Sequence, residues 1–164
     1  MLPNTTIAGE TPADDAAILA LNEETFGPGR FARAAERVRE GAPHDRALSF
    51  VARENGATVG TVRLTWIEIG SQRGCLLGPL AVRGHAKRHG IGGALIERSC
   101  GAAFAAGARF VLLVGDRPYY ERHGFEPVRG PVMPGPVDPV RLLVRWGEGP
   151  LALSGPVRAR CPER

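Results

Sequence analysis

The sequence contains almost no lysine and little cysteine. Of its 21 basic side chains, 20 are arginine, and Lys87 is the single lysine. The three cysteines, Cys75, Cys100 and Cys161, are far apart and form no C-x-x-C pair. This spacing argues against a structural zinc site and against a disulfide framework. We therefore expect a reduced protein without a bound metal, located in the cytoplasm.

Long hydrophobic runs are also missing. No stretch approaches about 18 consecutive apolar residues, and residues 1–12 lack the basic and apolar regions of a secretion signal. We therefore expect no membrane partner. A length of 164 residues, with 43% hydrophobic and 23% charged residues, is typical of one globular domain, which we expect to span residues 1–164.

Glycine and proline are plentiful, with 22 and 14 residues, and they separate the expected elements. Strands are expected at 5–8, 48–53, 58–69, 75–82, 110–114 and 140–146, and helices at 12–26, 31–39, 91–106 and 117–123. The Gly78-Pro79 pair predicts a bulge in its strand. Strand, helix and strand over 75–114 predict a βαβ unit with parallel strands. The tail, 147–164, is weakly patterned, and we expect irregular structure there.

The most informative stretch lies where an expected strand gives way to a helix, at Lys87-Arg88-His89-Gly90-Ile91-Gly92-Gly93-Ala94-Leu95. Glycines there let backbone N–H groups approach an anion, and the helix start adds about half a positive charge. A Rossmann fingerprint starting at Gly90 would need glycine where Leu95 stands, and a Walker A lysine would follow the glycines, whereas Lys87 precedes them. A phosphate-binding loop of another kind remains, with a glycine-rich turn without ligand as the alternative.

Two motifs carry a resemblance to a known family. Residues 80–82, the following loop and residues 88–95 are similar to the acyl-CoA-binding motif Q/R-x-x-G-x-G/A of the GNAT superfamily of N-acetyltransferases. Tyr119-Tyr120-Glu121-Arg122-His123-Gly124-Phe125 resembles the late motif of that superfamily. The resemblance is specific over 75–128. Lys87 departs from it, because it stands where the family has glutamine or arginine.

The resemblance implies a mixed α/β (α+β) fold. Its centre would be a twisted mixed sheet of about six or seven strands, with a bulged, splayed strand pair and flanking helices. It also implies acetyl-CoA as the cofactor and direct transfer of acetyl from the thioester to a primary amine in a ternary complex. The residues it places at the cofactor are Leu80, Ala81, Val82, Lys87, Arg88, His89, Gly90, Ile91, Gly92, Gly93, Asp116 and Tyr119.

The resemblance also implies catalytic roles. Tyr120 aligns with a general acid, and a phenol with a pKa near 10 can protonate a leaving thiolate whose pKa is about 8.5. Glu68 is the first candidate for a general base. His85, Asp116 and Glu23 are alternatives, and a base need not exist if the amine arrives neutral.

Two other functions compete with the enzyme: a non-catalytic acyl-CoA-binding or sensing module, and a nucleic-acid binder suggested by a pI of about 9.5. The positive charge is concentrated, because no acidic residue lies between Glu68 and Glu97 while Arg73, Arg83, Lys87 and Arg88 do. This position suits a polyanionic cofactor, so we expect no nucleic acid.

The acceptor is expected to be a small-molecule or peptide amine. Its walls would come from 25–41 and 130–139. Arg30, Arg33 and Arg37 leave open an acidic acceptor, although a solvated helix face explains them equally well. A homodimer is common in the family and is left open here.

Overall fold

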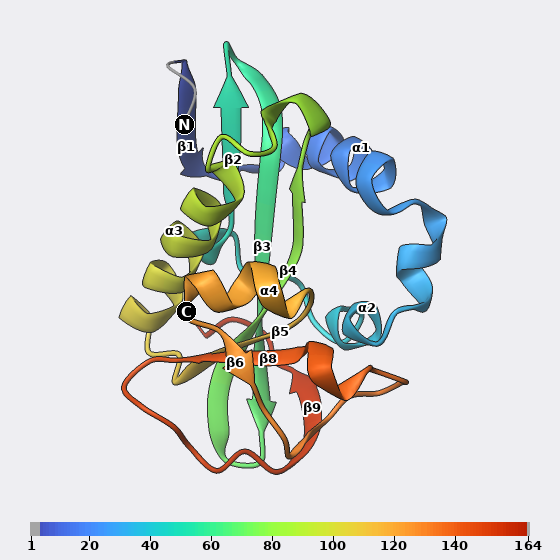
Figure 1. The fold of residues 1–164 in the computed structure, drawn as a ribbon, viewed down its shortest axis with the longest axis vertical. Helices are drawn as coiled ribbons and strands as arrows, with labels where there is room; N and C mark the ends of the chain where they lie inside the picture. Colours follow the sequence, from blue (N-terminus) through green and yellow to red (C-terminus); the bar gives the residue numbers. More distant parts are fainter. Residues whose placement is uncertain (1–3, 164) are drawn as a thin grey trace.

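A large mixed sheet forms the centre of the protein (Figure 1). The computed structural model describes residues 4–163, and at residues 31 and 32 only the backbone. Seven strands of the described chain follow one another in the order β1-β2-β3-β4-β5-β8-β6, and β7 and β9 join them through β3. The strands are β1 Thr5–Gly9, β2 Phe50–Glu54, β3 Ala57–Ile69, β4 Gln72–Val82, β5 Phe110–Val114, β6 Glu126–Pro127, β7 Pro131–Val132, β8 Leu142–Trp146 and β9 Gly155–Ala159.

The helices lie on both sides of this sheet (Figure 1): α1 Asp15–Phe26 and α2 Ala34–Arg39 on one side, α3 Ile91–Ala105 on the other, and the short α4 Arg117–Tyr120 after β5. The protein has two hydrophobic cores, one on each face of the sheet, because successive side chains of β3 point to opposite faces. Leu64 and Trp66 pack in the core with α3, whereas Ile67 and Ile69 pack in the core with Val38 of α2. The expected mixed sheet with flanking helices is confirmed.

Two sequence expectations about the helices and the tail need correction. The helix expected at 31–39 begins only at Ala34, because Arg33 has an extended backbone (φ −73°, ψ 147°) that follows a 3-10 turn at Pro28–Ala32. The tail is not irregular throughout, since β9 pairs antiparallel with β3 and parallel with β7. A proline at position 156 hides this strand in the sequence, and its partners are remote along the chain.

The predicted βαβ unit and the predicted bulge are both present. Strands β4 and β5 run parallel, with Cys75 opposite Val111 and Leu76 opposite Leu112. Further along β4, Leu77 faces Leu64 and Leu80 faces Val62, so two β4 residues, Gly78 and Pro79, stand opposite the single residue Arg63 of β3. One extra residue in a strand bends it and changes the direction of its side chains.

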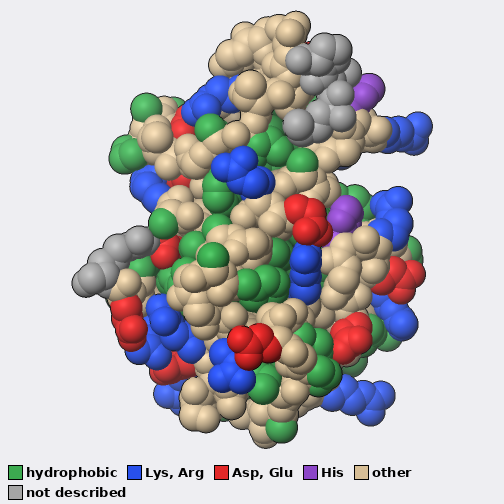
Figure 2. Space-filling model, turned by 90° about the vertical axis from the view of Figure 1, so that its left-hand side faces the viewer, with side chains coloured by type: hydrophobic (Ala, Val, Ile, Leu, Met, Phe, Trp, Pro, Cys, Tyr) green, Lys and Arg blue, Asp and Glu red, His purple; other side chains and the backbone are tan. Residues whose placement is uncertain are grey.

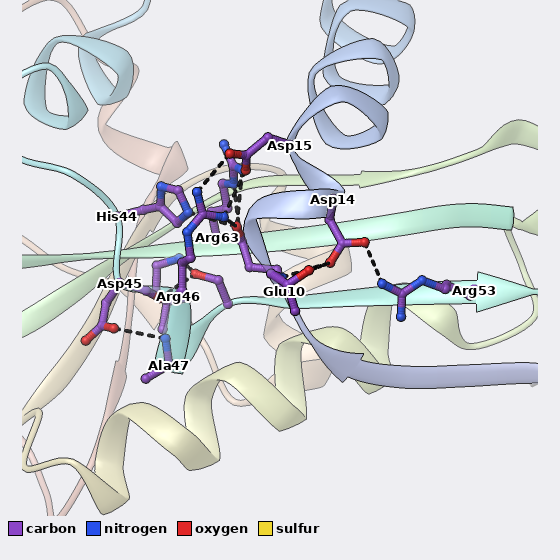
Figure 3. A network of polar contacts seen from close by, with 12 residues as sticks. Glu10, Asp14, Asp15, His44, Asp45, Arg46, Ala47, Arg53 and Arg63 are labelled. Carbon is purple, nitrogen blue, oxygen red and sulfur yellow. Dashed lines mark hydrogen bonds and ion pairs between the residues drawn. The ribbon is translucent and has the colours of Figure 1, made fainter. Parts of the chain in front are cut away.

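A buried carboxylate ties the start of the chain to the sheet (Figure 3). The Glu10 side chain is 0% exposed; it accepts hydrogen bonds from Arg46 (2.6 Å) and Arg63 (2.9 Å), and its Oε2 lies 3.0 Å from Nε2 of His44. Asp15, at the first turn of α1, pairs with the same two arginines. Burial alone would raise the pKa of Glu10, but the hydrogen bonds of His44 and Arg63 and the charge of Arg63 outweigh it, so the pKa is lowered.

We predict that Glu10→Gln destabilises the fold. The substitution leaves two guanidinium groups without their buried partner and should lower the free energy of unfolding by about 3 kcal/mol at pH 7, the low end for a broken buried pair, because both arginines keep contact with solvent. Urea unfolding at pH 7 measures this difference. Glu121→Gln breaks an exposed pair with Arg117 and serves as the control, with a loss below about 1 kcal/mol.

The stability difference between wild type and Glu10→Gln should also depend on pH. Because the pKa of Glu10 is lower in the folded protein than in the unfolded chain, its stabilisation is present above the unfolded pKa and is lost as pH falls through the folded pKa. The difference between wild type and Glu10→Gln should therefore shrink below about pH 4.5. A difference that stays constant down to pH 3 would contradict this assignment.

Candidate functional site

A cavity of about 1230 Å³ lies where β4, the start of α3 and the end of β5 come together. Its remaining walls come from the segment that includes the end of α1 and α2, from α4 and the residues just after it, and from residues 136–141. Both wall segments expected from the sequence, within 25–41 and 130–139, contribute. The cavity is large enough for a cofactor and a second small molecule.

Most of the residues expected to bind a cofactor line this cavity. They are Leu80, Val82, Lys87, Arg88, Gly90, Ile91, Gly92, Gly93, Asp116 and Tyr119, and Tyr120 lies among them. Two expected residues are not in the wall: the Ala81 side chain is buried in the sheet, and His89 is exposed beside the loop. The structure thus brings the two sequence motifs together around one space.

The cavity enters the sheet between β4 and β5. Within the described chain these strands pair only as far as Leu76 and Leu112, and β5 continues to Val114 beside β8. Beyond that point, β4 runs on through Leu80 and Val82 without β5 at its side. Backbone groups on this edge of β4 are therefore available to a ligand that lies along it.

The start of α3 forms one end of the cavity. Gly90 caps the helix in the left-handed conformation (φ 77°), and the first helical bond runs from the Ala94 N–H to the Gly90 carbonyl. The N–H groups of residues 91–93 precede that bond and have no partner within the helix. Together with the helix dipole, they make a site for an anion such as a phosphate.

Aromatic side chains of the late motif pack directly on glycines. A Cβ on Gly92 would collide with the Tyr119 hydroxyl, and one on Gly93 would collide with the His123 ring. Gly115, after β5, is likewise needed to make room for the Tyr120 ring. Each of these glycines therefore allows a contact that a larger residue would disturb, which explains glycine at the start of α3 and directly after β5.

Tyr120 is part of the cavity wall. Its ring packs edge-on against Tyr119 and Phe125. Burial raises the pKa of Tyr120 to about 12, an effect that the nearby Tyr119 and Asp116 reinforce and the charges of Arg141 and Arg39 oppose. A phenol with this pKa stays protonated across the physiological range and can donate a proton.

Glu68 lies elsewhere. It stands near the end of β3 opposite Arg73 of β4 and Arg158 of β9, and its carboxylate pairs with Arg160 at 3.2 Å. It does not line the cavity. Of the other candidates for a general base, Asp116 lines the cavity, whereas Glu23 and His85 do not.

The structure adds residues that the sequence did not single out. Arg39 and Glu36 of α2 line the cavity and form an ion pair at 2.9 Å. Of the arginines considered for an acidic acceptor, Arg30 and Arg33 line the cavity, but Arg37 donates instead to the Pro134 carbonyl and is exposed. The spacing of Glu36 and Arg39, three residues apart on a helix, is the signal that could have indicated them.

Charge is distributed differently in the cavity and on the outer surface. Figure 2 shows one face of the molecule, where basic and acidic side chains lie interspersed. The cavity wall instead carries seven basic side chains and three acidic ones among the described residues. The basic ones are Arg30, Arg33, Arg39, Lys87, Arg88, Arg122 and Arg141, and the acidic ones are Glu36, Asp116 and Asp138. This excess favours a ligand with several negative charges.

A splayed β4–β5 pair, a glycine-rich helix start and a partly buried phenol define the class of protein, an acyl-CoA-dependent transferase. Comparison with known proteins agrees: the model of the acetyltransferase (GNAT) domain matches residues 45–127. The chain belongs to the GNAT family of N-acetyltransferases. The resemblance seen in the sequence is thereby confirmed, as is the expectation of an acyltransferase enzyme.

Individual relatives extend over nearly the whole chain. An uncharacterized N-acetyltransferase of Escherichia coli (strain K12), YjhQ, is 29% identical, and the match covers 92% of this chain and 90% of that protein. The structure resembles the E. coli GNAT family N-acetyltransferase YhbS in complex with CoA, with a TM-score of 0.75, 23% identity, and coverage of 96% of this chain and 90% of that one. A GNAT family acetyltransferase from Brucella melitensis, in complex with acetyl-CoA, has a TM-score of 0.69 and 28% identity, with 94% of each chain covered.

The helices also bear on the question of a membrane span. Among the described residues, none of the helices combines the length and hydrophobicity needed to cross a lipid bilayer.

We predict that Gly92→Ala weakens acetyl-CoA binding by about tenfold or more, because the added methyl group displaces Tyr119 from the helix start and narrows the anion site. Calorimetric titration with acetyl-CoA measures the change. Gly101→Ala in the same helix is the control: a Cβ there meets open space, so Kd should stay unchanged while Tm rises by about 2–4 °C. Equal affinities of Gly92→Ala and wild type would rule out the packing role.

Proposed function

We propose that this cavity is the active site in which the protein, an acetyl-CoA-dependent N-acetyltransferase, moves acetyl from the thioester to a primary amine of a small molecule or peptide. Transfer is direct, within a ternary complex. The observation that carries the proposal is the meeting of three features in one space: the open edge of β4, the first N–H groups of α3 and the phenol of Tyr120.

The residues present fit the cofactor. The N–H groups of residues 91–93 would hold the pyrophosphate, and Lys87, Arg88 and Arg122 place positive charge beside it. The backbone of β4 from Leu80 to Val82 would hold the pantetheine arm by strand-like hydrogen bonds. Acetyl-CoA bound in this way supplies the acetyl group as an activated thioester.

The chain's own groups then complete the reaction. A backbone N–H near Leu80 would donate a hydrogen bond to the thioester oxygen as negative charge develops there. Tyr120 would give its proton to the departing thiolate, so that the C–S bond breaks as the new C–N bond forms. The amine loses one proton to solvent, from which the phenol is restored. Holding both substrates in one cavity supplies much of the rate enhancement.

Two further proposals accompany this function. The cytoplasm is proposed as the location, and the buried, free Cys75 and Cys100 are consistent with a reducing compartment. The possibility of a homodimer stays a prediction from the family resemblance.

We predict that acetyl-CoA stabilises the protein. At about 100 times its Kd, a ligand that binds only the folded state adds about 2.7 kcal/mol, or about 5–10 °C in Tm for a chain of this size. A thermal-shift titration measures it. S-acetylpantetheine, which lacks the phosphates that α3 would bind, is the control and should shift Tm less. An unchanged Tm at millimolar acetyl-CoA would overturn the cofactor assignment.

We predict that Tyr120→Phe lowers kcat by about 100-fold or more, the usual contribution of a general acid, with a much smaller change in the KM for acetyl-CoA. Tyr119→Phe is the matched control and should change KM more than kcat. Because the pKa of Tyr120 is about 12, loss of this acid should not reduce the wild-type kcat below about pH 11. A Tyr120→Phe enzyme with unchanged kcat, measured by thiol release, would remove the assignment.

A further inference from the structure

A second, smaller cavity adjoins the first. Its volume is about 240 Å³, which is enough for a carboxylate and the small groups attached to it. The two cavities share the walls formed by Arg30, Glu36, Arg39, Gly78 and Pro79. The remaining walls are Leu19 and Asn22 of α1, residues 42–44, and Arg63 and Thr65 of β3.

Arginine predominates among the charged side chains that line the smaller cavity. Three guanidinium groups line it, those of Arg30, Arg39 and Arg63, and Glu36 is the one acidic residue among its described walls. Arg63 is paired with Glu10 and Asp15, and His44 also lies beside Glu10. Arg30 donates to the Gly27 carbonyl and lies 3.9 Å from the exposed Glu23. Arg39 is shared with Glu36, which takes only its Nη1. Because its ion pair with Glu36 uses only Nη1, Arg39 keeps further donors for a ligand.

Two polar atoms in these walls are buried without a hydrogen bond in the described chain: Nε of Arg39 and Oδ1 of Asn22. A buried donor or acceptor left unpaired costs about 1–3 kcal/mol. A guanidinium whose Nη1 is engaged and whose buried Nε has no hydrogen-bond partner still has donors for an anionic oxygen, and carboxylates are the usual partners of such donors. These atoms mark a place where a polar ligand would complete the structure.

Arg39 also lies beside the reacting centre. Its Nη2 packs so closely against Gly78, in the β4 bulge, that a Cβ on this glycine would collide with it. The charge of Arg39 also acts on the pKa of Tyr120. An anionic group held by Arg39 would therefore sit next to the point on β4 where the thioester and amine must meet.

We propose that the acceptor amine carries a carboxylate, and that Arg39 binds this carboxylate where the two cavities meet. The inference rests on the proposed transferase function and names the substrate class of that site. The carboxylate can belong to a free amino acid or to a short peptide, and the volume of the smaller cavity favours an amino acid. Arg39 is then a specificity-determining residue, which orients the amine toward β4.

The test uses amines in matched pairs. Each L-amino acid is assayed beside its carboxamide, and each of several dipeptides beside its C-terminal amide, with thiol release as the readout. The amide keeps the size and loses the charge. Wild-type enzyme should show kcat/KM for the acids at least about tenfold above that for the amides, the effect of a charged hydrogen bond. The dipeptide pairs show which source of carboxylate is used.

Variants assign the effect to Arg39. Arg39→Gln should reduce kcat/KM for the acids by about 10- to 100-fold and bring the acid-to-amide ratio near one, while Kd for acetyl-CoA stays constant. Arg39→Lys should restore part of the ratio. Arg37→Gln removes the same charge from an exposed position on the same helix and should leave the ratio unchanged. A merely structural role of Arg39 would lower both members of a pair equally.

Three outcomes would overturn the inference: amides that equal or exceed acids in wild type, a ratio that survives in Arg39→Gln, or the same loss of ratio in Arg37→Gln. If Arg39→Gln fails to fold, the comparison of wild type with Arg39→Lys decides by the same ratio. If no amine is turned over, the proposed transferase function fails. Thermal shifts of the enzyme–CoA complex then decide the inference: greater stabilisation by acids than by amides supports it, and equal or absent stabilisation overturns it.

Discussion

The site depends on the separation of β4 from β5. Parallel strands in the middle of a sheet normally pair along their whole length, because unpaired backbone groups are costly when buried. Here the pairing ends at Leu76 and Leu112, close to the point where Gly78 and Pro79 add a residue to β4. The bulge bends β4 away and opens a gap inside the sheet. Without that gap, neither the exposed strand edge nor the cavity would exist.

The glycines and the aromatic residues act as one packing unit across this gap. Tyr119 and His123 contact Gly92 and Gly93 at the start of α3, and Tyr120 covers Gly115 at the end of β5. The helix start that suits a phosphate and the phenol that suits a thiolate are thus fixed relative to each other by direct contact. A shift of one would move the other, so the proposed proton transfer by Tyr120 would depend on cofactor binding through this packing.

Several parts of this structure could be predicted from the sequence. The apolar run 110–114, the Gly-Pro bulge and the glycine-rich loop each have a strong local signal, and the structure has β5, the bulge and the start of α3 there. The position of Glu68 relative to the cavity could not be predicted from the sequence. Only the register of β3 with β4 and β9 shows that it lies away from the gap, opposite Arg73 and Arg158. On α2, Arg37 and Arg39 look equivalent in sequence. Residues two positions apart on a helix, such as these, point about 200° away from each other. Only the orientation of the helix therefore decides which of the two faces the cavity. Strand β9 was missed because its pairing is entirely long-range.

The near absence of lysine has a consequence for an enzyme that handles a reactive thioester. A thioester acylates neutral amines, and arginine stays protonated at every physiological pH, so a guanidinium does not compete as an acceptor. Because 20 of the 21 basic side chains are arginine, the protein attracts a polyanion with groups that are inert toward the thioester. Lys87, in the cavity wall, is the one side-chain ε-amine that the chain exposes to self-acylation.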